Sequence, residues 1–477
     1  MTDRKPSFAP ERLSGWGRYP VETCYVFRPE KRSEVAATLA SGLQTSYIPR
    51  GLGRSYGDAA LNENAGVIWP ILLNRFLSFD SASGVLECES GVSLAEIIQF
   101  FLPRGWFLPV TPGTKYVTAG GAIAADIHGK NHHRDGSFSN FVLDFRLLAP
   151  TGEVLLCSPA AHSEIFWATV GGMGLTGVVM SARLRLRRVD SAYVFVDFFK
   201  AANLEDALAT MDASDERYEY SVAWIDALAT GKTMGRSVLM RGNHAPEAEL
   251  PARLRGPQSG MQDPQSGMRN PQSGIGNDSS IPTRPQWNLF MDFPSWALDR
   301  LTVQAFNTAY YAVHRTASRQ LVGFEKFFYP LDAISQWNRM YGKRGFVQYQ
   351  IALPQVSGRA GLRTILDRLA RSGRASFLAV LKRFGDAGNG LLSFPLRGYT
   401  LALDIPAARG LVPFLHELDR MTLDHGGRIY LAKDAVLRAE DFAAMYPKLE
   451  SFRAIQRKLD AQRLFSSSMA RRLRIVD

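Results

Sequence analysis

A string of six residues in the first third of the chain carries its most informative group of side chains. His128-Gly129-Lys130-Asn131-His132-His133 combines three imidazoles, an amine and an amide. Such groups can form a metal site, a phosphate cradle or the wall of a redox-cofactor pocket. Residues 118–126 (TAGGAIAAD), just before the string, are small, so backbone N–H groups can approach a bulky anionic ligand.

Two more glycine-rich segments could face the same ligand. Residues 49–58 (PRGLGRSYGD) follow a predicted strand, and residues 169–179 (TVGGMGLTGVV) hold four glycines within seven positions. Each segment alone is typical of a turn, and neither has the Walker lysine pattern or the regular dinucleotide fingerprint. Together with Pro112-Gly113-Thr114, they favour a large, extended ligand such as a dinucleotide.

A metal site is the weaker interpretation of the histidine string. Neighbouring side chains such as His132 and His133 point apart if the string is a strand, and no cysteine or carboxylate set completes a tetrahedral site. We therefore predict no metal. That His132 and His133 only hydrogen-bond within the protein core remains open at this point.

The elements that must position these residues indicate an α+β fold. Residues 20–190 read as short strands between glycine turns, with a Ser93-capped helix whose apolar residues follow helical spacing. From about residue 191 the strands lengthen, as at 193–199 and 346–354. Helical patterns occupy 362–371 and 411–423, so we expect a second α+β domain there.

One interruption separates these patterns. The tetrapeptide Pro-Gln-Ser-Gly begins at Pro257, Pro264 and Pro271, a seven-residue period. Proline and glycine in every unit exclude a coiled coil, and the repeat has no apolar face to bury. We predict a disordered surface insertion over residues 255–284, with a mobile lid or docking segment as the alternative.

Composition narrows the classes of protein. The 477 residues are 46% hydrophobic and 21% charged, as in soluble globular proteins, and carry a formal net charge of +11. A basic surface suits anionic lipid or a phosphorylated substrate, but no basic run interleaved with aromatics indicates a nucleic-acid groove. Three cysteines without metal or redox spacing favour a reducing compartment. We expect no signal peptide and no transmembrane segment, hence a cytoplasmic protein with at most peripheral contact at the inner membrane.

Eight stretches carry a resemblance to a known family. They are 50–58 (RGLGRSYGD), 126–133 (DIHGKNHH), 166–177 (FWATVGGMGLTG), 337–342 (WNRMYG), 348–350 (QYQ), 381–385 (LKRFG), 392–395 (LSFP) and 427–434 (GRIYLAKD). Apart from the repeat, nearly the whole chain resembles the decaprenylphosphoryl-β-D-ribose 2′-oxidases, FAD-dependent members of the vanillyl-alcohol-oxidase superfamily.

The resemblance implies a two-domain PCMH-type FAD-binding fold. The FAD-binding domain would span residues 1–190 and be completed by 425–477, while 191–424 would form a substrate domain on an antiparallel sheet. Some relatives attach FAD covalently through a histidine where this chain has Arg54, so we expect non-covalent FAD. The implied cofactor-binding residues are Arg50, Gly51, Gly53, Arg54, Ser55, Tyr56, Gly57, Gly113, Thr118, Gly120, Gly121, Ala125, Asp126, His128, Val179 and Tyr430.

The implied reaction is oxidation of the 2′-hydroxyl of a polyprenyl-phosphoryl-β-D-ribose to a 2′-keto intermediate. The resemblance makes Lys433, Tyr56 and His128 the catalytic residues. Its substrate-side positions are Lys382, Gln350 and Asn389. A desolvated lysine can accept a proton, a second lysine suits phosphate, and an amide suits a sugar hydroxyl.

The resemblance also implies a separate NAD(P)H-dependent short-chain reductase, which would complete epimerisation to the arabinose form. The basic tail at 469–474 (MARRLR) is consistent with docking at an anionic membrane. Two alternatives remain open: an FAD-dependent oxidase of a soluble sugar, alditol or aldonolactone, and a non-catalytic flavin-binding redox sensor.

Overall fold

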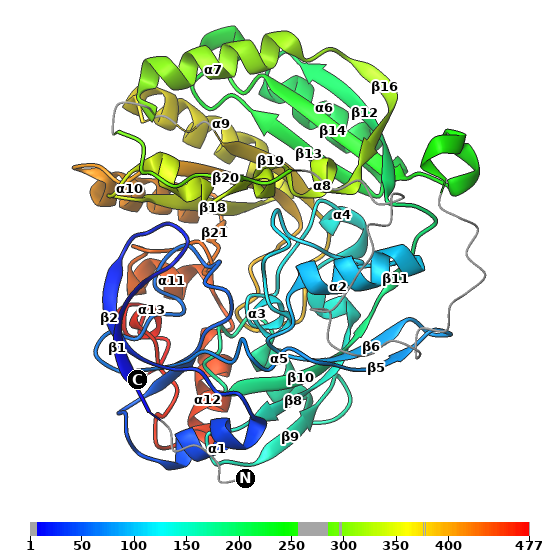
Figure 1. Ribbon diagram of the computed structural model, residues 1–477. Coiled ribbons are helices and arrows are strands. Elements are labelled where there is room, and N and C mark those ends of the chain that lie inside the picture. Colours follow the sequence, from blue (N-terminus) through cyan, green and yellow to red (C-terminus); the bar gives the residue numbers. More distant parts are fainter. Residues whose placement is uncertain (1–6, 256–284, 295–297, 375, 377, 477) are drawn as a thin grey trace.

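The computed structural model describes residues 7–255, 285–294, 298–374, 376 and 378–476. The predicted insertion falls almost entirely on residues 256–284, which lie outside the described residues, so it stays a prediction. The described chain is α+β, as predicted, and its strands form three main sheets (Figure 1). Two of the sheets come from the first 190 residues, and the third comes from residues after 190.

The two N-terminal sheets are small. The first has the order β1 (Ala9–Ser14), β2 (Val21–Phe27), β4 (Gly66–Ile68) and β3 (Tyr47–Pro49). The second has the order β5 (Phe76–Asp80), β6 (Val85–Glu89), β10 (Val178–Arg185), β8 (Val142–Leu148) and β9 (Val154–Cys157). Strand β7 (Trp106–Phe107) pairs with β11 (Arg187–Arg188) beside them.

The third sheet has eight strands. Their order is β16 (Ala317–Gly323), β12 (Tyr193–Ala201), β14 (Ser237–His244), β13 (Tyr220–Ile225), β19 (Ala379–Phe384), β20 (Gly398–Pro406), β18 (Phe346–Pro354) and β21 (Arg428–Ile429). Every pairing within it is antiparallel, as predicted for this part of the chain. A short parallel pair, β15 (Trp287–Asn288) with β17 (Ile334–Ser335), lies outside it.

The helices fall into three groups. Those of the N-terminal part are α1 (Arg32–Ala40), α2 (Leu94–Phe101), α3 (Ala119–Ala124), α4 (His132–Asp135) and α5 (Ser163–Thr169). The middle group is α6 (Leu204–Ser214), α7 (Arg300–Val313), α8 (Phe324–Phe328), α9 (Gln355–Ser372) and α10 (Leu411–Asp424). The last are α11 (Ala439–Met445), α12 (Leu449–Leu459) and α13 (Ser468–Arg472).

Local sequence signals explain several helix boundaries. The Ser93 hydroxyl accepts a hydrogen bond from the Glu96 N–H at 3.1 Å, and the Glu96 carboxylate accepts one from the Ser93 N–H at 2.7 Å. This reciprocal capping box starts α2, as the serine predicted. Helices α9 and α10 cover the predicted stretches, although α9 begins earlier, at Gln355. The histidine pair does not lie on a strand, the arrangement considered for it above; it begins the short helix α4.

The eight-stranded sheet separates a helical layer from the N-terminal part. Helices α6, α9 and α10 pack on one side of it, and the N-terminal loops face the other side (Figure 1). The C-terminal helices α11 and α13, orange to red, lie among the blue N-terminal elements. The division into domains at residues 190 and 425 remains our interpretation of this arrangement.

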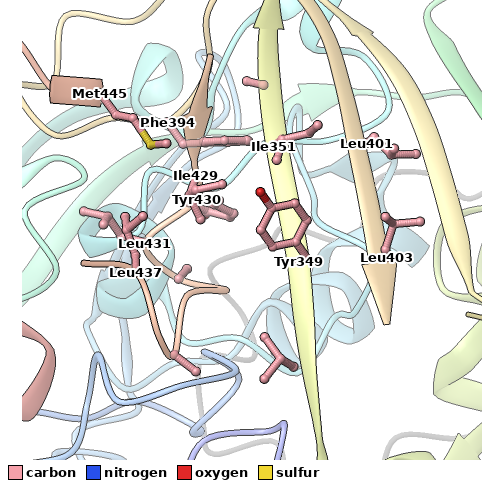
Figure 2. Packing of buried hydrophobic residues seen from close by; sticks show 14 of the residues in the cluster. Tyr349, Ile351, Phe394, Leu401, Leu403, Ile429, Tyr430, Leu431, Leu437 and Met445 are labelled. Atoms are coloured by element: carbon pink, nitrogen blue, oxygen red, sulfur yellow. The ribbon is translucent and has the colours of Figure 1, made fainter. Parts of the chain in front are cut away.

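The side chains of strand β18 point alternately to the two sides of the sheet, and each side packs against a different layer. Tyr349 and Ile351 belong to the main hydrophobic core and pack with Leu401 and Leu403 of β20 (Figure 2). Because side chains alternate along a strand, Gln348 and Gln350 must point to the opposite side. Both glutamines are buried all the same. A buried amide needs hydrogen-bond partners, so this second side is a polar layer inside the protein.

Candidate active site

One face of the eight-stranded sheet gathers the polar residues of three adjacent strands. In the antiparallel register, Gln348 of β18 lies opposite Asp404 of β20, and Thr400 of β20 lies opposite Lys382 of β19. Gln350 donates a hydrogen bond from Nε2 to the Thr400 hydroxyl at 3.2 Å. The sheet thus supplies an amide pair, a carboxyl and an amine to one surface.

Three loops bring the remaining residues to this surface. The loop after β3 carries Tyr56, the segment between α3 and α4 carries His128 and Lys130, and the turn after β21 carries Lys433. The Lys433 Nζ lies 3.8 Å from the centre of the Tyr56 ring, a cation–π distance. Of the predicted catalytic and substrate residues, the structure therefore brings Lys433, Tyr56, His128, Lys382 and Gln350 to one place.

His128 is held as a neutral imidazole with a defined tautomer. Its Nε2 accepts a hydrogen bond from Gln350 Nε2 at 3.0 Å, so the ring proton resides on Nδ1. Burial, followed by repulsion from Lys382, places the pKa of His128 well below its ordinary value. Phe384, Phe394 and Tyr430 pack around the ring, and no described side chain accepts from Nδ1. An N–H donor is therefore left for a ligand.

Three lysine amines make the site electropositive. Burial lowers the pKa of Lys130 to about 7, that of Lys382 to about 8 and that of Lys433 to about 7, and mutual repulsion contributes for Lys130 and Lys433. Within the described ranges none of the three forms an ion pair with a carboxylate, although Lys130 donates to the Phe328 carbonyl at 2.9 Å. Such a cluster suits an anionic ligand.

Hydrogen bonds and close packing join the loops of Tyr56 and Lys433. The Tyr56 N–H donates to the Ala432 carbonyl at 2.9 Å. A Cβ added at Gly57 would overlap the carbonyl oxygen of Asp434, so glycine is required there for close approach of two backbones. Gly57 therefore supports the position of Lys433, a role that the prediction of cofactor contact did not include.

An ion triad with two buried carboxylates reinforces the same junction. Arg472 of α13 donates to Asp58 Oδ2 at 2.9 Å, to Asp58 Oδ1 at 2.7 Å and to Asp434 Oδ2 at 2.9 Å. Its remaining nitrogen donates to the Leu437 carbonyl at 2.6 Å. Arg472 belongs to the basic tail that is predicted to dock at a membrane. Its guanidinium donates hydrogen bonds within the protein, so Arg472 is not available for contact with lipid.

A cavity lies between the two N-terminal sheets and α3. Six of the predicted cofactor residues line it: Arg50, Gly51, Thr118, Gly120, Gly121 and Val179. The Thr118 hydroxyl caps α3 by accepting from the Gly121 N–H at 3.1 Å. A Cβ at Gly51 would overlap the Thr118 hydroxyl, and one at Gly120 would crowd Ser90. The glycine cradle and the unpartnered His128 N–H together fit a cofactor as extended as FAD.

The other predicted cofactor residues lie elsewhere. Arg54 lines a second cavity, with its guanidinium 3.8 Å from the Trp16 ring centre. Asp126 is fully buried and accepts from the Ser393 hydroxyl at 2.6 Å, which ties two loops together. The Tyr430 hydroxyl donates to the Ala125 carbonyl at 2.8 Å.

The remaining predicted residues lie outside the lysine cluster and do not line the first cavity. They are the predicted cofactor residues Gly53, Ser55 and Gly113 and the predicted substrate residue Asn389. Gly53 adopts a φ of 65° beside the Arg50 guanidinium, and the Ser55 carbonyl accepts from the Trp16 N–H at 2.7 Å. Gly113 has open space around it, and Asn389 is exposed on the loop after β19.

The remaining histidines of the string hold elements together. His132 Nδ1 accepts from the Gly385 N–H at 3.2 Å, and His133 Nε2 donates to the carbonyls of Asp215 and Tyr218 at 3.2 and 3.0 Å. These contacts agree with the core hydrogen-bonding interpretation. Across the described part of the chain, no three His, Cys, Asp or Glu side chains are grouped to hold a metal ion.

Sequence reasoning missed three members of the site. Lys130 lies within the histidine string itself, so its type and position were a usable signal. Gln348 and Asp404 are polar residues inside apolar strands, a pattern that also fits a strand with one solvent-facing side.

The three cysteines are free and buried. No helix in the described ranges is both long and apolar enough to cross a membrane.

Comparisons with known proteins agree with this geometry. A model of the FAD binding domain matches residues 24–158, and a model of D-arabinono-1,4-lactone oxidase matches residues 336–473. The chain is 38% identical to decaprenylphosphoryl-beta-D-ribose oxidase of Mycolicibacterium smegmatis over 98% of both chains. It is 36% identical to an uncharacterised protein of Streptomyces coelicolor, over 80% of this chain and 100% of that one. Human Delta(24)-sterol reductase is 26% identical over 39% of this chain and 34% of its own.

Proposed function

Because the chain belongs to the family of decaprenylphosphoryl-β-D-ribose oxidases, we propose that it oxidises the 2′-hydroxyl of a polyprenyl-phosphoryl-β-D-ribose to a ketone. It is an FAD-dependent oxidoreductase. The observation that carries the choice of substrate is the pair of Lys130 and Lys382, whose amines form no ion pair with a carboxylate in the described ranges. A phosphate-bearing sugar supplies the missing negative charge, which a neutral alditol or lactone does not.

The reaction removes a hydride from C2′ and a proton from the 2′-oxygen. FAD, when bound, accepts the hydride. With a pKa lowered to about 7 by burial, the Lys433 amine is partly neutral at physiological pH and can accept the hydroxyl proton. The Tyr56 ring then stabilises the resulting ammonium through its cation–π contact.

Tyr56 and His128 orient the reactants instead of acting as bases. Burial raises the pKa of Tyr56 well above its ordinary value, so the phenol stays protonated. His128 stays neutral, and its Nδ1–H is available to donate to the cofactor or the substrate. Gln350 uses its amide nitrogen for His128 and Thr400, so its contact with the sugar would involve the carbonyl oxygen.

Anaerobic reduction of the bound flavin tests this proposal. We expect polyprenyl-phosphoryl ribose to bleach the flavin absorbance, and free alditols or aldonolactones to react at least 100-fold more slowly. Rapid bleaching by the soluble compounds, with none by the lipid-linked ribose, would favour the lactone-oxidase alternative that the match at residues 336–473 raises. Bound flavin that no sugar reduces would favour a redox sensor.

The keto product needs a second enzyme if the outcome is epimerisation. The proposal therefore includes a separate NAD(P)H-dependent short-chain reductase that returns a hydride to C2′ from the opposite face. Adding such a reductase with NADPH to the oxidase and its substrate should convert the keto sugar to the arabinose form. If only the ribose form is recovered, the reductase step is wrong while the oxidation proposal still stands.

We also propose peripheral contact with a membrane from the cytoplasm, through a surface beside the second cavity. Trp287, Phe290 and Met291 are 75%, 78% and 62% exposed, and Lys343 and Arg344 are exposed next to them. The two segments adjoin, since β15 pairs with β17 and the Phe293 N–H donates to the Arg339 carbonyl at 3.0 Å. Exposed aromatic and cationic side chains together suit the headgroup region of an anionic bilayer.

Replacing Trp287, Phe290 and Met291 by serine should weaken binding to phosphatidylglycerol-containing vesicles at least about tenfold, because apolar area is no longer buried in the bilayer. Co-sedimentation measures this. The matched control replaces Val154 and Leu156, which are 52% and 45% exposed on β9, by serine and should bind like wild type. Equal loss in both variants, or none in the first, would contradict the assigned surface.

A further inference from the structure

Asp404 is a buried carboxyl that the proposed chemistry leaves without a role. Its side chain is fully buried on β20, directly opposite Gln348 of β18. It accepts hydrogen bonds from Gln348 Nε2 at 2.5 Å and from the Tyr341 hydroxyl at 3.2 Å. No described lysine or arginine lies within ion-pair distance of it. Burying a carboxylate without a paired cation is costly, so its presence calls for an explanation.

The contacts of Asp404 lead to both Tyr56 and Lys433. Tyr341, which donates to Asp404, stacks on Phe346 with ring centres 4.0 Å apart, and Phe346 contacts the Tyr56 ring edge to face at 5.5 Å. Lys433 lies over the Tyr56 ring and is attracted electrostatically by Asp404. The titratable groups that act on the carboxyl are thus Lys433 from the turn after β21 and the phenols of Tyr341 and Tyr56.

We propose that Asp404 is a positioning residue that sets the basicity of Lys433. Its negative charge stabilises the ammonium form of Lys433, which burial and Lys382 both disfavour. The inference rests on the proposed function only in taking Lys433 as the group that accepts the substrate proton.

The protonation of the two groups supports this assignment. Burial raises the pKa of Asp404 to about 7, and burial lowers the pKa of Lys433 to about 7. Two interacting groups that titrate in one pH range do so as a pair, and the charge of each depends on the other. Asp404 therefore limits how far burial can lower the proton affinity of the lysine.

Asp404→Asn is a nearly isosteric test. The asparagine oxygen can still accept from Gln348, and its NH₂ can donate to the Tyr341 oxygen, so mainly the charge is lost. Without the carboxylate the ammonium of Lys433 is less stable, so its pKa should fall by about one unit. Competitive labelling of amines with acetic anhydride across pH, followed by peptide mass spectrometry, measures the pH at which Lys433 is half-reactive and needs no substrate.

The acid limb of flavin reduction should shift in the same direction and by the same amount. Tyr341→Phe removes one hydrogen bond to the carboxylate, which favours its protonated form, and should shift Lys433 in the same direction by less. This second variant keeps the test available if Asp404→Asn does not fold.

Asp419→Asn is the matched control. Asp419 is a buried carboxyl on α10, which packs on the core side of β18, and burial raises its pKa to about 8. Its loss should leave the labelling profile of Lys433 unchanged. An unchanged or alkaline-shifted Lys433 in Asp404→Asn, or an equal shift in Asp419→Asn, would overturn the inference. Because labelling does not require turnover, that result would be distinct from failure of the proposed function.

Discussion

Replacing Lys433 by alanine is expected to slow the reduction of bound flavin by substrate by about 10²- to 10⁴-fold, the usual contribution of a positioned acid–base group. The side chain lies over Tyr56 in the lysine cluster and does not line the glycine-lined cavity, so FAD content should stay at the wild-type level. Stopped-flow absorbance under anaerobic conditions measures the rate, and flavin release after denaturation measures the content.

The pKa of Lys433 also predicts the direction in which the rate of flavin reduction changes with pH. Burial lowers the pKa of Lys433 to about 7, so the amine is neutral, and able to accept a proton, only above that pH. The wild-type rate should therefore rise with pH through about 7, and the alanine variant should lack this limb. Lys458→Ala, which removes an exposed lysine from α12, is the control and should behave like wild type. Wild-type turnover by the Lys433 variant would rule out the lysine as the base.

Replacing Arg472 by alanine should lower the free energy of unfolding by about 3–5 kcal/mol, the usual effect of removing one partner from a buried ion pair. The change leaves the carboxylates of Asp58 and Asp434, 5% and 3% exposed, without their cation. Urea denaturation followed by tryptophan fluorescence measures the loss. Since the triad also holds the loops of Tyr56 and Lys433 together, flavin reduction should slow even where the protein remains folded.

Arg471→Ala is the matched control for this variant. Arg471 is the exposed neighbour on the same helix and donates to the neutral Asn62 at 2.6 Å, so its loss should cost about 0.5 kcal/mol. Combining Arg472→Met with Asp58→Asn and Asp434→Asn removes the unpaired charges and should restore much of the stability. Equal losses at 471 and 472 would show that the triad contributes no special stability.

Local and motif-level features of this chain could be predicted from the sequence. The Ser93 cap, the long strands and the helices after residue 350 depend on nearby residues, and these predictions are confirmed. The α+β class and the antiparallel third sheet are confirmed as well. Lys433 and His128 could be nominated because each lies in a distinctive string, although their contacts could not.

What the sequence could not supply was the side of each strand that faces the site. Gln348 and Asp404 alternate with apolar residues as in a strand with one solvated face, and only the packing of loops over the sheet buries them. The sequence also did not show which glycines line a ligand cavity and which allow two backbones to approach closely. Gly51 and Gly120 line the cavity, whereas Gly57 admits the backbone of Asp434, and the same residue type serves both needs.

The triad of Asp58, Asp434 and Arg472 also has a consequence for biosynthesis. Asp58 and Arg472 are 414 positions apart, so Asp58 is translated long before Arg472. On the ribosome, the loop of Tyr56 therefore cannot acquire its final support until translation has passed Arg472. A polypeptide released before that point would lack the clamp even with every proposed catalytic residue present. Premature termination should thus yield inactive chains instead of partly active oxidase.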